Sequence, residues 1–354
     1  MKYFFKITAL FISCFCITFI FGQNAPIPLT CKDFDSLGQN QISGICSFKD
    51  NIYLLGEHKR PYSELCESWK IFRISTNSIE INEGSNIGMI KDTKTIYLDS
   101  INYIMNKIDV RNGGVSYDGL ESILIINDTV YFTVETKYKR SDSGYLIRGF
   151  LLNDNNIRMD TSFLIGIPKP GVDKRVVYNA GFESMIEING YIYVFFEFNN
   201  YQSDKRSRVY GSNIVYKILP DSGIVNTFPI DPIPFRLTDV TKFDDCTFLA
   251  TNFFFKGNEE RIYRENISSQ ERDSIYVSNS YRSFGRVIKI SLKNNKFSLE
   301  NIWNIPRNAE PNKNFTSWNW EGIQRFRNGV LIINDQYKGS SDDNTSLIYF
   351  DLGL

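Results

Sequence analysis

The stretch FESMIEINGYIYVFFE, from Phe182 to Glu197, holds two short runs of apolar and aromatic residues on either side of Asn189 and Gly190. An Asn-Gly pair between two such runs is typical of a β-hairpin with a two-residue turn. The stretch also carries a glutamate at its second position and another at its last, although glutamate is depleted in strands. A carboxylate at both ends of a hairpin therefore needs an explanation.

Four other stretches repeat this pattern: ISGICSFKDNIYLLGE (Ile42 to Glu57), LESILIINDTVYFTVE (Leu120 to Glu135), TDVTKFDDCTFLATN (Thr238 to Asn252) and WEGIQRFRNGVLIIND (Trp320 to Asp335). Each reads as a strand, a polar turn and a second strand. Across the five hairpins, the second residues are Ser43, Glu121, Glu183, Asp239 and Glu321. Both ends of a hairpin lie at the same edge of its sheet. Each repeat therefore places oxygen-bearing side chains at one edge.

The second residues of successive hairpins lie 78, 62, 56 and 82 positions apart, which leaves room for four antiparallel strands in each repeat. The fifth repeat lacks a strand, and IPLTCKDF (Ile27 to Phe34) near the N-terminus is left over. Pairing the two would remove an exposed sheet edge. The sequence therefore predicts an all-β fold, a single β-propeller of five four-stranded blades closed by the N-terminal strand. A sixth blade in the long first or fourth spacing is the alternative.

The first residues are typical of a secretory signal peptide. Lys2 and Lys6 precede an apolar run from Ile7 to Phe21, and Gly22 offers a cleavage site. We expect residues 1–22 to be removed and residues 23–354 to form the propeller domain, exported as a monomer to the periplasm or the medium. The apolar run is shorter than the roughly 20 residues of a membrane-spanning helix, so the mature chain is expected to have none.

Charge and cysteine content narrow the remaining possibilities. Lys and Arg total 40 and Asp and Glu total 40, so the chain has no overall basic field for binding nucleic acid. Four cysteines follow the signal peptide, and an exported protein meets oxidising conditions. Disulfides and buried free thiols both remain open for these cysteines, which are Cys31, Cys46, Cys66 and Cys246.

The first strand of each propeller blade lines the central channel, so the second residues of the hairpins are expected to meet around the axis. Carboxylates crowded together are unfavourable unless a proton or a cation neutralises them. Oxygen donors without His or Cys favour calcium. We therefore predict Ca²⁺ held by Ser43, Glu121, Glu183, Asp239 and Glu321. The alternative is that these carboxylates accept hydrogen bonds from backbone amides of the next blade and so join the blades.

A second layer of polar residues follows the hairpins. The last residues of four hairpins are candidates to orient a water molecule in catalysis: Glu57, Glu135, Glu197 and Asp335. Basic residues in the loops beyond them could bind a small phosphorylated ligand that bridges the metal and the loops. These candidates are His58, Arg60, Lys137, Arg140, Arg206 and Arg261.

The ordered hairpins resemble the secreted β-propellers of the esterase-like activity of phytase family. The matching segments are QISGI, GLESI, NAGFESM, RLTDVTKF and NWEGI, each followed by its second strand. The axial residues are also similar to those of the calcium-activated apyrases, whose ligand order is Ser, Glu, Glu, Ser, Glu. Asp239 departs from that order, and the basic catalytic loops of the apyrases do not align here.

These resemblances imply a calcium-bound propeller that hydrolyses phosphoric esters at the mouth of its channel. Two other functions remain open at this point. One is a non-catalytic propeller that binds a ligand or partner and uses calcium structurally, and the other is an apyrase-like nucleotidase.

Overall fold

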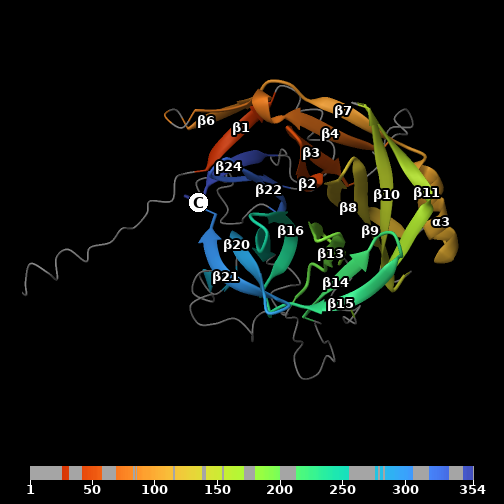
Figure 1. Ribbon diagram of the computed structural model, residues 1–354. Coiled ribbons are helices and arrows are strands. Elements are labelled where there is room, and N and C mark those ends of the chain that lie inside the picture. The colour runs from red at the N-terminus through yellow and green to blue at the C-terminus, as the bar shows by residue number, and fades with distance from the viewer. Residues whose placement is uncertain are drawn as a thin grey trace, which may run out of the picture.

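The computed structural model shows strands arranged as blades around one axis (Figure 1). It describes residues 26–31, 42–57, 69–82, 84, 86–114, 116–137, 141–153, 155–170, 180–199, 213–254, 276–277, 280–281, 284–305, 319–334 and 346–353. The predicted signal peptide and Cys66 lie outside these residues. Within them, no helix has both the length and the apolar character needed to span a membrane.

Five four-stranded blades follow one another along the chain. Blade 1 contains β2 (Ile42–Phe48), β3 (Asn51–Gly56), β4 (Lys70–Ser75) and β7 (Lys94–Asp99). Blade 2 contains β8 (Tyr117–Ile126), β9 (Thr129–Thr136), β10 (Ser143–Asn153) and β11 (Asn156–Pro168). Blade 3 contains β12 (Ser184–Ile188), β13 (Tyr191–Phe195), β14 (Ile214–Leu219) and β15 (Ile224–Pro229). Blade 4 contains β16 (Arg236–Lys242), β17 (Thr247–Phe254), β20 (Phe284–Lys293) and β21 (Lys296–Asn304). A separate two-stranded ladder joins β18 (Tyr276–Val277) and β19 (Ser280–Tyr281).

Blade 5 joins the two ends of the described chain. Its strands are β22 (Trp320–Phe326), β23 (Gly329–Asn334), β24 (Leu347–Asp351) and, antiparallel to β24, β1 (Ile27–Cys31). The predicted all-β propeller of five blades, closed by the N-terminal strand, is therefore confirmed. Figure 1 shows β1 and β24 side by side.

The hairpins form because their turn residues accept left-handed backbone conformations. Asn127 and Asp128 have φ of 48° and 63°, and Asn189 and Gly190 have φ of 53° and 79°. Two consecutive residues of positive φ make the turn whose twist matches that of the flanking strands, and Asn, Asp and Gly tolerate it best. The polar turns recognised in the sequence thus fix the register of these hairpins.

The long first spacing holds a hairpin and a helix rather than a sixth blade. After the short 3₁₀ turn η1 (Thr76–Ser78), strands β5 (Ile79–Asn82) and β6 (Ile87–Ile90) form a hairpin, and β6 pairs in parallel with β1 of blade 5. Helix α3 (Ile101–Arg111) follows β7. Neither the hairpin nor the helix was predicted from the sequence.

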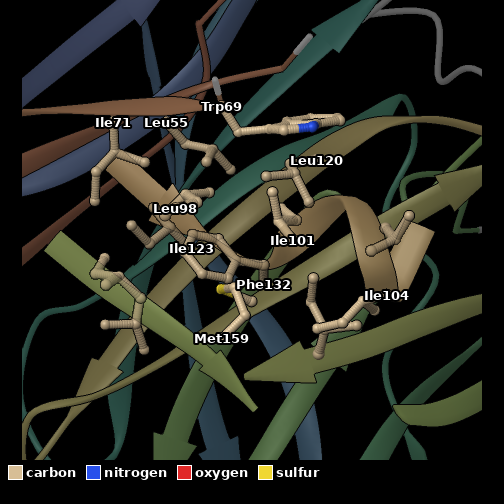
Figure 2. Packing of buried hydrophobic residues seen from close by; sticks show 14 of the residues in the cluster. Leu55, Trp69, Ile71, Leu98, Ile101, Ile104, Leu120, Ile123, Phe132 and Met159 are labelled. Atoms are coloured by element: carbon tan, nitrogen blue, oxygen red, sulfur yellow. The ribbon is translucent and has the colours of Figure 1, made fainter. Parts of the chain in front are cut away.

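Helix α3 covers part of the core shared by blades 1 and 2. Its buried residues are Ile101, Ile104, Met105 and Ile108, which is the spacing of one helical face. Figure 2 shows Ile101 and Ile104 beside Leu120 and Phe132. Along the outer rim, β7 also pairs in parallel with β11, so blades 1 and 2 form one continuous sheet.

Cys46 and Cys246 lie in different surroundings. Cys46 is buried in the core of blades 1 and 2, and Cys246 is exposed at the turn between β16 and β17. Neither forms a disulfide within the described residues. The alternative of a buried free thiol holds for Cys46, whereas Cys246 is an exposed free thiol.

Closure by β1 can be tested with one buried and one exposed residue of that strand. Leu29 is buried in an apolar cluster with Leu347 and Ile90, whereas Thr30 points to solvent. We expect Leu29→Asp to lower the free energy of unfolding by about 3 kcal/mol or more, because it buries a charge in the seam between blade 5 and the β5–β6 hairpin.

Thr30→Asp is the matched control, since it places the same charge on the opposite face of the same strand. It should cost about 1 kcal/mol or less, mainly through loss of the 3.2 Å hydrogen bond from Thr30 Oγ1 to the carbonyl of Gly88. Urea unfolding of both variants measures the difference. Equal losses would contradict a structural role for β1 in ring closure.

Candidate functional site

The first strands of the five blades lie next to one another around the axis. Strand β2 lies beside β8 and β22, β8 beside β12, and β16 beside both β12 and β22. This arrangement brings equivalent positions of different blades together. It is the convergence that the sequence predicted.

Register irregularities mark one equivalent position in four of these strands. In β2 the pairing with β3 shifts around Ser43, in β8 it shifts around Glu121, and in β22 it shifts around Glu321. In β16 the shift lies between Leu237 and Asp239, so the equivalent residue is Thr238. The hairpin alignment that assigned Asp239 to this position was therefore out of register by one residue. The name axial ring is used below for Ser43, Glu121, Glu183, Thr238 and Glu321.

Asp239 instead joins neighbouring blades. The backbone N–H of Ile323 in β22 donates to its Oδ2 at 2.9 Å, and its own blade donates the N–H of Val240 to its Oδ1 at 2.8 Å. Burial raises the pKa of Asp239 well above its usual range, and the bonds from these amides and from Ile45 oppose that rise. For this residue the alternative of a carboxylate that links blades is the better description.

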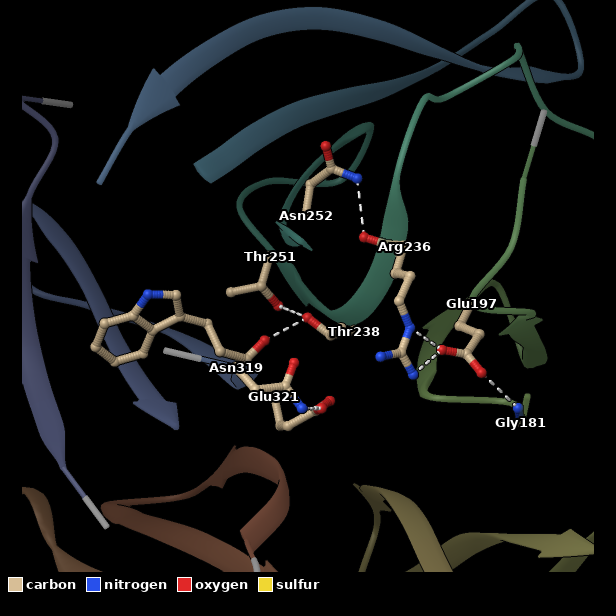
Figure 3. Close-up of polar contacts among 9 residues, drawn as sticks. Gly181, Glu197, Arg236, Thr238, Thr251, Asn252, Asn319 and Glu321 are labelled. Atoms are coloured by element: carbon tan, nitrogen blue, oxygen red, sulfur yellow. Dashed lines mark hydrogen bonds and ion pairs between the residues drawn. The ribbon is translucent and has the colours of Figure 1, made fainter. Parts of the chain in front are cut away.

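Hydroxyl groups fix the backbone beside the three ring glutamates. Ser43 Oγ donates to the carbonyl of Leu120 at 2.6 Å, and Thr133 Oγ1 donates to the carbonyl of Phe182 at 2.7 Å. Thr238 Oγ1 donates to the carbonyl of Trp320 (Figure 3). Each accepting carbonyl directly precedes a ring glutamate, so the preceding blade helps to set the position of each glutamate.

Three glutamates meet around Gly181, at the junction of blades 2 and 3. The N–H of Gly181 donates to Glu197 Oε1 at 3.0 Å. A Cβ at this glycine would lie 2.9 Å from Glu183 Oε1 and 3.3 Å from Glu135 Cδ. The three side chains are each 5% exposed or less. A residue with a side chain would fill the space that these carboxylates share.

Two cations adjoin this cluster, the buried Lys169 and the partly buried Arg236, and neither was among the predicted site residues. Arg236 forms an ion pair with Glu197 through its guanidinium group (Figure 3). The charge of Lys169 lowers the pKa of Glu135, and the Lys169 Nζ donates to the carbonyl of Thr136. Arg236 could have been noticed because it stands two residues before Thr238, the position that Gly181 holds relative to Glu183.

The backbone before Arg236 is strained. Phe235 is fully buried and has φ of 71°, a left-handed conformation that a bulky residue rarely adopts. The side-chain amide of Asn252 donates to the carbonyls on both sides of it, at 3.0 Å to Pro234 and 2.9 Å to Arg236. The surrounding contacts therefore hold this conformation and the position from which Arg236 reaches Glu197.

Two other glutamates, Glu57 and Glu121, meet at Gly119, between blades 1 and 2. A Cβ there would lie 2.7 Å from Glu57 Cγ and 3.2 Å from Glu121 Oε1. Glu121 is buried, and its Oε1 has no hydrogen-bond partner among the described residues. The residue at the corresponding place in blade 5 is Asn319, whose side-chain amide donates to Glu321 Oε1 (Figure 3).

Burial dominates the proton affinities of this site. It raises the pKa of Glu121 and of Glu183 well above the usual range, and neighbouring glutamates add to both shifts. Burial raises the pKa of Glu135 to about 8, although Lys169 opposes the rise. It also raises the pKa of Glu197, against the opposing effects of Arg236 and the Gly181 N–H.

The other predicted site residues are less central or lie outside the described part. Lys137 is exposed, and its Nζ is 3.6 Å from Asp118 Oδ1. Six predicted residues lie outside the described residues: His58, Arg60, Arg140, Arg206, Arg261 and Asp335. Within the described residues, no group of three or more His, Cys, Asp or Glu side chains is arranged to hold a metal ion.

Comparison with known proteins gave structural matches alone. No family model matches the sequence, and no curated protein matches it. An exo-β-1,3-galactanase from Phanerochaete chrysosporium is 10% identical, with a TM-score of 0.46 over 88% of this chain and 60% of that one. An α-L-arabinanase from Cellvibrio cellulosa is 12% identical, with a TM-score of 0.46 over 88% of this chain and 91% of that one. The catalytic domain of an α-L-arabinofuranosidase from Coprinopsis cinerea is 9% identical, with a TM-score of 0.42 over 93% of this chain and 97% of that one.

These findings correct the resemblance drawn from the sequence. The similar structures are glycoside hydrolases rather than phytases or apyrases, and no family match supports the phytase resemblance. The expectation of a phosphoric ester hydrolase is therefore corrected, and neither the apyrase-like nucleotidase nor the purely binding propeller finds support. The short motifs misled because they record how blades begin, which is shared by propellers of unrelated activity. At these TM-scores the matches carry no argument about activity.

The raised pKa of Glu135 predicts how stability changes with pH. Its ordinary value is 4.5 and its folded value is about 8, so the folded protein binds a proton that the unfolded chain has lost. This contribution to the free energy of unfolding is complete below about pH 4.5 and falls as the pH rises to about 8. We expect Glu135→Gln to weaken the fall in melting temperature between pH 5 and pH 8.

Glu187→Gln is the control, because Glu187 lies at the β12–β13 turn, where it accepts a bond from the Gly190 N–H. Melting curves across this pH range should be unchanged in slope for that variant. An unchanged slope in Glu135→Gln would show that this carboxyl is not protonated in the folded protein.

Proposed function

We propose that the carboxylates around Gly181 form the active site of a hydrolase that acts on glycosidic bonds. Hydrolysis of such a bond needs two carboxyl groups with different tasks. One donates a proton to the leaving oxygen, and the other acts in its ionised form as a nucleophile or as a base for water. The two groups must therefore differ in proton affinity at the same pH.

One observation carries the proposal: Glu183 and Glu197 adjoin the same glycine but have different partners. Glu197 accepts hydrogen bonds from the Arg236 guanidinium and the Gly181 N–H, and both donors favour its ionised form. For Glu183, burial and the charge of Glu197 are the two largest causes of its raised pKa. Glu183 therefore keeps its proton to a higher pH than Glu197.

These properties assign a role to each residue. Glu183 is the general acid, and Glu197 is the ionised partner that stabilises positive charge as the bond to the leaving oxygen breaks. Arg236 holds Glu197 in place and in its charged form. The names of the similar structures, an arabinanase and a galactanase, agree with a glycan substrate, but the proposal rests on these carboxylates and not on that similarity.

Calcium remains a proposal, in a narrower form than the sequence suggested. Around Gly181 the chain supplies its own cations, Lys169 and Arg236, so a metal ion is not needed there. Glu121 has a buried oxygen without a hydrogen-bond partner among the described residues, which is the kind of donor that calcium takes. We propose that Glu121, with Glu57 and Ser43 beside it, would hold Ca²⁺, with water and carbonyl oxygens completing its ligands.

The acid role of Glu183 can be tested with aryl glycosides of different leaving groups. Glu183→Gln should lower kcat/KM on glycosides of poor leaving groups by about 10²- to 10⁴-fold, because it removes general acid catalysis. The loss should be much smaller with dinitrophenyl glycosides, whose leaving group needs little protonation. A panel of pentosides and hexosides, hydrolysed by wild type and variant, supplies the measurement.

Glu187→Gln again serves as the control, since it is the same substitution on strand β12 at a residue bonded to the Gly190 turn. It should keep full activity. The proposal is overturned if the wild type hydrolyses no glycoside of the panel, or if Glu183→Gln loses activity equally on every leaving group.

Calcium binding is tested separately by heat. Wild type should melt at a higher temperature with added Ca²⁺ than with a chelator, because a ligand that binds the folded state stabilises it. Glu121→Gln keeps the shape of the side chain and removes its charge, so most of this calcium-dependent gain should disappear. A wild type whose melting temperature ignores calcium would refute the site.

A further inference from the structure

Lys169 is a buried lysine that the proposed mechanism leaves without a task. It is 8% exposed, and it follows β11 between Pro168 and Pro170. Burying an ammonium group is costly unless nearby groups compensate it. Something at this position therefore favours a charge over an apolar side chain.

The backbone around Lys169 is firmly held. Its N–H donates to the carbonyl of Asp142 at 2.8 Å, and Pro168 pairs with Ser143 in the ladder between β10 and β11. The two prolines restrict the backbone on both sides of the lysine. From this backbone the side chain extends to the end of β9, where its Nζ donates to the carbonyl of Thr136.

Thr136 directly follows Glu135, so the ammonium group is anchored beside that carboxylate. Thr136 is itself fixed, because its hydroxyl donates to the carbonyl of Ser143 at 2.5 Å. Four acidic groups interact with the ammonium charge: Glu121 from β8, Glu135 from β9, and Glu183 and Glu197 from the two ends of the β12–β13 hairpin. Glu135 has the largest effect of the four.

We propose that Lys169 is a positioning residue, anchored beside Glu135 by its bond to the carbonyl of Thr136, that stabilises the negative charge of Glu197 and leaves Glu183 to carry the proton. The inference rests on the proposed function of this cluster. It explains why three glutamates can adjoin one glycine without sharing one role. Arg236 and Lys169 both lower the pKa of Glu197, whereas for Glu183 the effect of Arg236 is smaller than those of burial and of the neighbouring glutamates.

The direction of the pKa shifts agrees with this division. Burial lowers the pKa of Lys169, and the four glutamates oppose that change. The glutamates therefore favour the charged form of the lysine. Lys169 in turn lowers the pKa of both Glu135 and Glu197. Removing its charge should therefore move the protonation of both carboxylates to higher pH.

The test compares Lys169→Met with Lys107→Met. Lys107 also donates its Nζ to a backbone carbonyl, that of Thr161 at 2.8 Å, but it lies on helix α3. In Lys169→Met the acidic limb of the kcat/KM profile should move to higher pH by about one unit, since an opposite charge nearby shifts a carboxyl by about that much or more. Lys169→Arg should restore the profile, and Lys107→Met should leave it unchanged.

A second readout does not depend on finding a substrate. The fall in melting temperature from pH 5 to pH 8 should be steeper in Lys169→Met than in wild type, because Glu135 would then hold its proton to still higher pH. If no glycoside is hydrolysed, the proposed function fails while this readout still decides the role of Lys169. Equal slopes in Lys169→Met and Lys107→Met would overturn the inference.

Should Lys169→Met fail to fold, the double variant Lys169→Met, Glu135→Gln decides the question. Above about pH 8, where Glu135 ionises, removing both charges should restore folding if the lysine acts by compensating that carboxylate. A double variant that also fails to fold, while Glu135→Gln alone folds, would show that the lysine has a packing role instead.

Discussion

Five strands that begin at one axis impose a constraint that the rest of the molecule must satisfy. Because β2, β8, β12, β16 and β22 lie side by side, whatever side chain begins one of them meets the side chains of its neighbours. In this protein those side chains include buried glutamates, whose desolvation is unfavourable. The hydroxyl bonds between blades, the partly buried Arg236, the buried Lys169 and the raised proton affinities all respond to that crowding.

Four blades differ at one position, two residues before the axial ring. Glycine at 119 and 181 leaves space in which carboxylates of adjacent blades meet. Arg236 fills the same position in blade 4 with a cation, and Asn319 fills it in blade 5 with a hydrogen-bond donor. A ring of similar blades thereby becomes chemically asymmetric, which a reaction with distinct acid and charged partners requires.

The sequence was sufficient to predict the blades, because hairpin turns such as Asn189–Gly190 and the alternation of apolar residues are local signals. It also held a signal for Thr238 that the hairpin alignment passed over, because Thr238 precedes Asn252 by 14 residues, the spacing found in the other four hairpins, whereas Asp239 does not. Lys169 was missed for another reason. It follows the outermost strand of blade 2 and reaches Glu135 only through the fold.

Strand β1 lies between β24 of blade 5 and β6 of the hairpin that follows β4, so it pairs with partners from distant parts of the chain. During synthesis β6 is made soon after β1, whereas β24 is made after the other four blades. The β1–β6 pair can therefore form early and keep the first strand in place while the remaining blades emerge. Completion of the ring then becomes the docking of a late strand onto an edge already prepared for it, which limits the time that β1 could pair with a second molecule.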